Sequence, residues 1–97
     1  MKLVWSNLAR QELDDLRRHS TDTWGTSVAR SYLEDIRTAA KTVASHPERA
    51  RFLRDRFRIL RVRSHYLIVH VDSEEQRLTV ARILHTAMDI ERHLPIV

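Results

Sequence analysis

The first third of the chain changes from a short apolar run to a helical repeat. Three apolar residues at 3–5 precede Ser6, a frequent helix-capping residue, so a brief strand followed by a helix is predicted. Across residues 7–19, apolar side chains recur at helical spacing while charged ones occupy the other positions: Ala9, Leu13 and Leu16. A strand this short needs a neighbouring strand for its stability.

The second repeat predicts a longer helix. Gly25, the only glycine, lies in or just before its first turn, and the polar stretch 19–23 offers several N-caps. The i, i+3, i+4, i+7 pattern then continues for four turns through Ala29, Tyr32, Leu33, Ile36, Ala39, Ala40 and Val43. Pro47 ends the helix, because the residue before a proline is driven out of the helical region. Two helices with a short polar link predict an antiparallel hairpin packed on a sheet.

The third pattern is β-branched and predicts an antiparallel meander. Runs at 58–63, 66–72 and 77–85 are separated by short polar turns at 64–65 and 73–76. In the first run the alternation shifts at Ile59–Leu60, which predicts a β-bulge there. Residues 66–71 of the second run are largely apolar on both faces, as expected for an inner strand covered on both sides. Residues 48–55 show no clean period and are expected to form a loop.

After these strands, Thr86 is expected to cap a short helix that Pro95 stops, with Ala87, Ile90 and Leu94 on its apolar side. The predicted fold class is therefore α+β, in the order β-α-α-β-β-β, with a helical hairpin on a small antiparallel sheet and a short C-terminal helix. The 97 residues are expected to form a single domain, 1–97.

Composition narrows the class of protein further. With 42% hydrophobic residues and no cysteine, the chain fits a small globular domain that has neither disulfides nor thiolate metal sites. No run is long enough for a membrane span, and a secretory leader is not expected, so a cytoplasmic protein is predicted. A single glycine also excludes a glycine-rich nucleotide loop.

Charge is distributed unevenly along the chain. Residues 1–48 carry equal numbers of basic and acidic side chains, and residues 64–97 carry a small acidic excess. The net charge of +4 therefore comes from residues 49–63, where seven arginines accompany the single acidic residue Asp55. Such a cluster favours an anionic partner, although a solvated loop that discourages edge-to-edge aggregation explains it equally well.

Several short phrases, taken together and in order, resemble the RelE/ParE toxin superfamily, and its ParE branch in particular. They cover nearly the whole chain: Ser6 with Ala9, Asp15–Leu16, the break at Pro47, Arg58, the strand Tyr66–Asp72, Ile83–His85, and Asp89. One departure is His70, where the family commonly has tyrosine.

The resemblance implies a toxin of a type II toxin–antitoxin pair. It implies inhibition of DNA gyrase, which blocks replication, and neutralisation by a ParD-like antitoxin in a hetero-oligomeric complex. It implies neither a cofactor nor a membrane partner, and direct nucleic-acid binding is not expected without the antitoxin. The implied action is binding rather than catalysis.

The alternative is the RelE branch, whose members cleave mRNA on the ribosome. Such chemistry needs a charge stabiliser beside a proton-transfer group, and Arg61, Arg82 and His85 are the candidates in this chain. No tyrosine follows Tyr66, however, so the C-terminal tyrosine of many nuclease members is missing. His85 also has a structural interpretation, in which it bonds Asp89 and caps the chain reversal. No histidine pair has metal-binding spacing, so no metal site is expected.

Binding candidates follow from charge and exposure. The antitoxin is expected in a groove between the hairpin and the sheet, where apolar contacts give affinity and arginines give steering. The target is expected at the C-terminal segment or the arginine-rich edge. The candidate residues are Arg56, Arg58, Arg61, Arg63, Trp24, His85, Asp89, Ile90 and Leu94.

Overall fold

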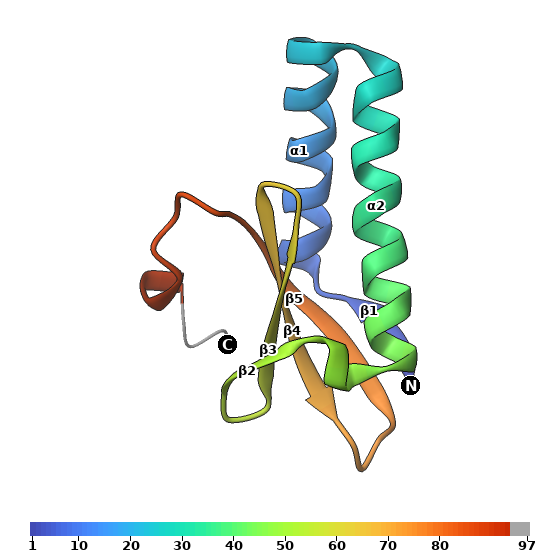
Figure 1. Ribbon diagram of the computed structural model, residues 1–97, viewed down its shortest axis with the longest axis vertical. Helices are drawn as coiled ribbons and strands as arrows, with labels where there is room; N and C mark the ends of the chain where they lie inside the picture. The colour runs from blue at the N-terminus through green and yellow to red at the C-terminus, as the bar shows by residue number, and fades with distance from the viewer. Residues whose placement is uncertain (94–97) are drawn as a thin grey trace.

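The computed structural model describes residues 1–93 and confirms the α+β class, with a helical hairpin packed on one side of a sheet (Figure 1). In chain order the elements are β1 (Lys2–Trp5), α1 (Asn7–Trp24), α2 (Thr26–Ser45), the 3₁₀ turn η1 (Pro47–Arg49), β2 (Arg51–Arg54), β3 (Phe57–Val62), β4 (His65–Asp72), β5 (Arg77–His85) and the 3₁₀ turn η2 (Ile90–His93). None of the described helices is both long and apolar enough to cross a membrane.

Ser6 begins α1 as predicted and also ties the helix to the sheet. Its Oγ accepts a hydrogen bond from the Ala9 backbone N–H at 2.9 Å and donates one to the Ala81 carbonyl at 2.8 Å. Both hydrogen-bonding capacities of one hydroxyl are used, so the start of α1 is fixed against β5.

The predicted first helix ends too early, at residue 19, whereas α1 continues to Trp24. The polar residues at 19–23 extend α1 and do not cap the second helix. Within this extension, the Thr21 hydroxyl donates a hydrogen bond to the Arg17 carbonyl at 2.7 Å. Gly25 alone separates the helices, because its φ of 91° and ψ of 170° lie in a region that is open essentially only to glycine. The hairpin link is therefore a single residue.

The apolar face of α2 is buried as its period predicts, and the helix ends at Ser45, before Pro47. Its side chains join those of β3, β4 and β5 in the main core, which includes Ile36, Val43, Leu67 and Val80. This packing fixes the hairpin on one face of the sheet.

The sheet has five strands in the order β1-β5-β4-β3-β2. The meander of β3, β4 and β5 is antiparallel, as predicted, with turns between Val62 and His65 and between Asp72 and Arg77. The short strand β1 finds its neighbour in β5 but runs parallel to it, so the sheet is mixed where an antiparallel sheet was predicted. One strand was missed: β2 lies within the expected loop, because it forms by pairing with β3 while most of its side chains stay exposed.

The predicted bulge at Ile59–Leu60 is wrong, since β3 pairs with β4 in an unbroken register. The apparent slip arises because both faces of the sheet are apolar. Leu60 and Val62 face the main core, whereas Phe57 and Ile59 belong to a second cluster with Ile68 and Leu84. The irregularities lie elsewhere, in β2 near Leu53 and in β5 at Ala81.

The second apolar cluster is covered by the C-terminal segment, which lies across the sheet from the helices (Figure 1). Ile90, in η2, packs against it. The predicted C-terminal helix is only this short 3₁₀ turn, and Thr86 does not start it. Asp89 instead accepts a hydrogen bond from the Glu91 backbone N–H at 3.1 Å. The expected contribution of Leu94 lies outside the described residues.

Candidate functional site: the histidine pocket

A pocket of about 420 Å³ opens between the helical hairpin, the β3–β4 turn and the end of β5. We call it the histidine pocket, because three of its lining residues are histidines. Its lining consists of Glu12, Asp15, Leu16, His19, Trp24, Tyr32, Ser64, His65, Ile83, His85 and Met88. Its size is typical of a binding site, and both apolar and polar side chains line it.

A hydrogen-bonded pair forms the inner wall of this pocket. Tyr32, from α2, places its hydroxyl 2.6 Å from Nδ1 of His65, at the start of β4. The same hydroxyl accepts the Ser64 backbone N–H at 3.0 Å, which leaves its proton free to be donated to Nδ1. The two rings also meet edge to face, with centroids 5.4 Å apart. These contacts join α2 to the β3–β4 turn.

His65 stays neutral at pH 7. Burial in the pocket wall lowers its pKa to about 4, and the nearby His85 and His19 add to the lowering. His85 faces it from the neighbouring strand, with ring centroids 5.1 Å apart. Nδ1 of His85 accepts the Ala87 backbone N–H at 3.0 Å, so the expected bond from His85 to Asp89 is replaced by a local turn contact.

The charge of Glu12, which lines the pocket, is neutralised by an arginine outside the lining. Arg82, in β5, donates to both carboxylate oxygens of Glu12, the shortest contact being 2.8 Å, and their side chains are only 15% and 18% exposed. Glu12 also accepts the Ile83 backbone N–H at 2.9 Å. Two of the five N–H donors of this guanidinium are used, and its charge is compensated within a largely buried ion pair, so it is poorly placed to receive a phosphate.

The arginines proposed from sequence are dispersed by the fold. Arg58 donates to the Ala50 carbonyl at 2.9 Å, and Arg61 donates to the Arg63 carbonyl at 2.8 Å. Arg63 itself binds Asp35 of α2 and lies over the Tyr32 ring, 4.9 Å from its centroid.

Arg56 lies 4.0 Å from Asp72. The strand β3 is also not an edge, because β2 covers it. The candidates Arg56, Arg58, Arg61 and Arg63 therefore do not lie together along a sheet edge, although the edge strand β2 carries Arg51 and Arg54.

Of the nuclease candidates, only His85 lines the pocket, while Arg61 and Arg82 are engaged elsewhere. Of the binding candidates, Trp24 and His85 come together at the pocket, whereas Ile90 lies against the second sheet face. Sequence reasoning missed the contributions of Glu12, His19, Tyr32 and His65. Within residues 1–93, no group of three or more His, Asp or Glu side chains is arranged to hold a metal ion.

The bulge at Ala81 explains why the His65–His85 pair was missed. The β4–β5 turn places Asp72 opposite Arg77, and that register continued without a break would set His65 opposite Leu84. One extra residue in β5 shifts the pairing, so that His85 comes opposite His65. The turn alone predicts the β4–β5 register near His65 with an error of one residue, and the bulge accounts for that error.

Comparison with known proteins gives this geometry a family context. A family model described as "ParE toxin of type II toxin-antitoxin system, parDE" matches residues 3–90. The chain belongs to the ParE toxin family. It is therefore a ParE-family toxin of a toxin–antitoxin system, in agreement with the resemblance in its sequence.

Curated relatives extend over almost the whole chain. "Toxin ParE1" of Mycobacterium tuberculosis is 32% identical over 96 residues, which cover 96% of this chain and 97% of the relative. "Toxin ParE1" of Caulobacter vibrioides is 28% identical over 92 residues, covering 92% and 93%. The match is thus not confined to a single element.

Solved structures confirm the fold. A chain described as "Chromosomal ParDE TA system from P. aeruginosa" superimposes with a TM-score of 0.75 at 19% identity, covering 88% of this chain and 95% of that chain. A chain of the toxin–antitoxin complex RelBE2 from Mycobacterium tuberculosis gives 0.65 at 18% identity, covering 87% and 95%. The ParE and RelE branches therefore share this architecture.

Proposed function

We propose that this toxin inhibits DNA gyrase in the cytoplasm by binding it, and that a ParD-like antitoxin neutralises it. Membership of the ParE family supports the target class, since the family model is that of a parDE toxin. The observation that carries the binding mode is the Glu12–Arg82 ion pair, in which the nuclease candidate Arg82 is held by a carboxylate and lies outside the lining of the histidine pocket. A binding toxin has no need of a free charge stabiliser at this position.

The histidine pocket is the proposed binding site for an apolar side chain of the antitoxin. Trp24 and Met88, at the rim, are 58% and 47% exposed, and Leu16 and Ile83 line the interior. Large exposed apolar side chains around a concave site are typical of interaction surfaces. Arg63, beside Tyr32, would steer an acidic flank of the antitoxin toward the pocket.

Paired activity assays test the target. Purified toxin is added to a plasmid-supercoiling reaction with gyrase, and in parallel to a ribosome-dependent mRNA cleavage reaction. We expect loss of supercoiling with intact mRNA. Cleaved mRNA with undisturbed gyrase would contradict the proposal and identify the toxin as a nuclease.

Binding to the antitoxin encoded by the neighbouring reading frame tests the pocket. We expect Trp24→Ser with Met88→Ser to raise the dissociation constant by about ten-fold or more, because anchor residues dominate interface energies. Phe52→Ser is the matched control, because Phe52 is 63% exposed but lies on β2, away from the pocket. Equal losses in both proteins would place the interface elsewhere.

A second candidate function, ribosome-dependent mRNA cleavage, is favoured by one observation. His19, His65 and His85 surround the pocket together with the Tyr32 hydroxyl, and groups of this kind transfer protons. If the cleavage assay is positive, His85→Gln separates the roles. We expect that this variant then loses cleavage while it stays folded, as circular dichroism would show.

A further inference from the structure

A second concavity lies between the two helices, on the other flank of α1 from the histidine pocket, and the proposed function leaves it unused. It has a volume of about 350 Å³, shares no lining residue with the histidine pocket, and is called here the hairpin groove. Three arginines line it: Arg17 from α1, and Arg30 and Arg37 from α2. Two threonines complete its polar lining, and no carboxylate side chain belongs to it.

Two of these arginines, Arg30 and Arg37, have no carboxylate partner within the described residues, a lack that they share with Arg10, Arg49, Arg51, Arg58 and Arg61. Eight arginines, in all parts of the fold, form ion pairs with Asp or Glu. Within residues 1–93, neither Arg30 nor Arg37 forms such a pair or a side-chain hydrogen bond. Their positive charge is therefore available to an external anion.

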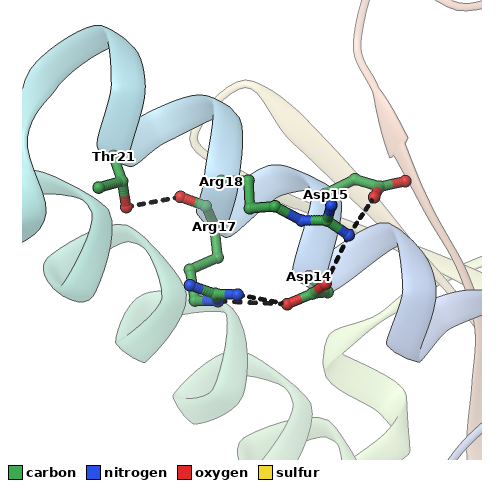
Figure 2. Close-up of polar contacts among 5 residues, drawn as sticks. All are labelled: Asp14, Asp15, Arg17, Arg18 and Thr21. Atoms are coloured by element: carbon green, nitrogen blue, oxygen red, sulfur yellow. Dashed lines mark hydrogen bonds and ion pairs between the residues drawn. The ribbon is translucent and has the colours of Figure 1, made fainter.

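Arg17 is the third donor, and it is already positioned. Its Nε and Nη2 bind the same carboxylate oxygen of Asp14, at 3.3 and 2.7 Å, as Figure 2 shows. Arg18 binds the other oxygen of Asp14 at 2.7 Å. Hydrogen bonds from Arg17 and Arg18 lower the pKa of Asp14, so the carboxylate stays ionised. This network holds Arg17 while leaving its Nη1 free of the carboxylate.

The arrangement along the hairpin favours an extended anion. Arg30 and Arg37 are two helical turns apart, which is about 10 Å along α2. Because the helices reverse at Gly25, Arg17 faces the part of α2 that lies between them. About four successive phosphates of one strand of a duplex span the same axial distance, in three steps of about 3.4 Å each. Guanidinium groups suit phosphate geometry well.

The floor of the groove argues against the other anionic ligands. Ala29 and Leu33 lie beneath the arginines but are buried, so an acidic peptide would find almost no apolar anchor. No aromatic or amide side chain lines the groove, so it offers neither an aromatic stacking surface nor the amide contacts that read adenine. Contact with the backbone of a duplex requires neither feature.

We propose that the hairpin groove binds the phosphate backbone of double-stranded nucleic acid, independently of its sequence, through Arg17, Arg30 and Arg37. This revises the expectation that the toxin alone does not bind nucleic acid. It also moves the anion-binding surface from the arginine-rich segment at 49–63 to the helical hairpin.

Fluorescence anisotropy with a labelled DNA duplex of about 20 base pairs tests the proposal across about 50–200 mM salt. For Arg30→Gln/Arg37→Gln we expect about ten-fold weaker binding at the lowest salt. We also expect the slope of log affinity against log salt to become shallower by about two, since two phosphate contacts are lost. Each single variant should change the slope by about one.

The matched control is Arg49→Gln/Arg51→Gln. It removes the same charge from two exposed arginines outside the groove, and it should keep the slope and nearly all of the affinity. Urea midpoints and circular dichroism establish that both double variants are folded. Equal or larger losses in the control overturn the proposal, because binding then follows net charge or the segment at 49–63. Failure of the wild-type toxin to bind DNA, or equal binding of polyglutamate, also overturns it.

Discussion

Tyr32 and His65 show how two residues of ordinary appearance become a structural unit. The apolar period places Tyr32 in the core, and it is indeed buried. Its hydroxyl nevertheless contacts Nδ1 of His65 and the Ser64 backbone N–H, and its ring face contacts Arg63. A phenol that is buried at one end and polar at the other can serve the core and the pocket together.

Protonation of His65 should destabilise the toxin in mildly acidic solution. Its pKa is about 4 in the folded protein and near 6.5 when unfolded, so the unfolded chain binds the proton more tightly. The stability that His65 contributes is therefore complete above about pH 6.5 and is lost as the pH falls toward 4. After allowance for screening of a half-buried ring, we expect a loss of about 1–2 kcal/mol.

Urea unfolding at a series of pH values measures this loss. The dependence should flatten in His65→Gln and persist in the exposed control His46→Gln. If His65→Gln retains the wild-type pH profile over this range, another group is responsible.

Among single-residue changes, Glu12→Ala should be one of the most destabilising. It leaves the guanidinium of Arg82 nearly buried without its counter-charge and removes the acceptor of the Ile83 backbone N–H. We expect a loss of about 3 kcal/mol in the free energy of unfolding, measured by urea denaturation. Glu34→Ala, on the exposed side of α2, should change stability by no more than about 0.5 kcal/mol.

Among the elements, the single-residue link at Gly25 has the strictest backbone requirement. An added Cβ would meet no atom within 4 Å, so any cost of Gly25→Ala comes from the backbone conformation alone. With φ of 91° and ψ of 170°, we expect a loss of about 1–3 kcal/mol.

Thermal unfolding measures the effect at Gly25. Ser27→Ala, in the first turn of α2, serves as the control for introducing alanine at this end of the helix and should be nearly neutral. An unchanged melting temperature in Gly25→Ala would show that the helices can be joined in another backbone conformation.

The helices and strands also show which elements can be predicted from the sequence and which cannot. The α2 helix and the β3–β4–β5 meander follow from long periodic runs, in which burial and period agree. Strand β2 carries no such signal, because backbone pairing with β3 forms it while Phe52 remains exposed. The end of α1 depends on one glycine rather than on any of the five polar residues before it.

The site was harder to predict than the fold, for a related reason. The histidine pocket collects residues from α1, α2, the β3–β4 turn and β5. Their proximity depends on how the hairpin sits on the sheet and on the extra residue in β5, neither of which leaves a local pattern. Likewise, arginines that cluster in the sequence are separated by alternation along β3 and by their individual partners.

For the molecule as a whole, the sheet has to be covered on both faces. The helices cover the main core, and Ile90 packs against the second cluster of Ile59, Ile68 and Leu84. We expect Ile90→Ala to cost about 1–2 kcal/mol, less than a fully buried isoleucine, and to increase binding of a hydrophobic dye.

Met88→Ala, two residues earlier, is the matched control, because Met88 belongs to the histidine pocket and not to the second cluster. Its stability and dye binding should remain close to those of the parent. A dye signal that rises equally in both variants would mean that the C-terminal segment loosens as a unit.

The pairing of β1 with β5 has a consequence for the synthesis of this toxin. The partners come from opposite ends of the chain, and the hydrogen bond from Ser6 to Ala81 spans 75 residues. Such a distant contact forms slowly, whereas the hairpin of β4 and β5 closes locally. On the ribosome, the pairing of β1 and the hydrogen bond from Ser6 to Ala81 must wait until β5 has emerged. The histidine pocket, which needs the end of β5, is thus completed last, and an unfinished polypeptide cannot present it.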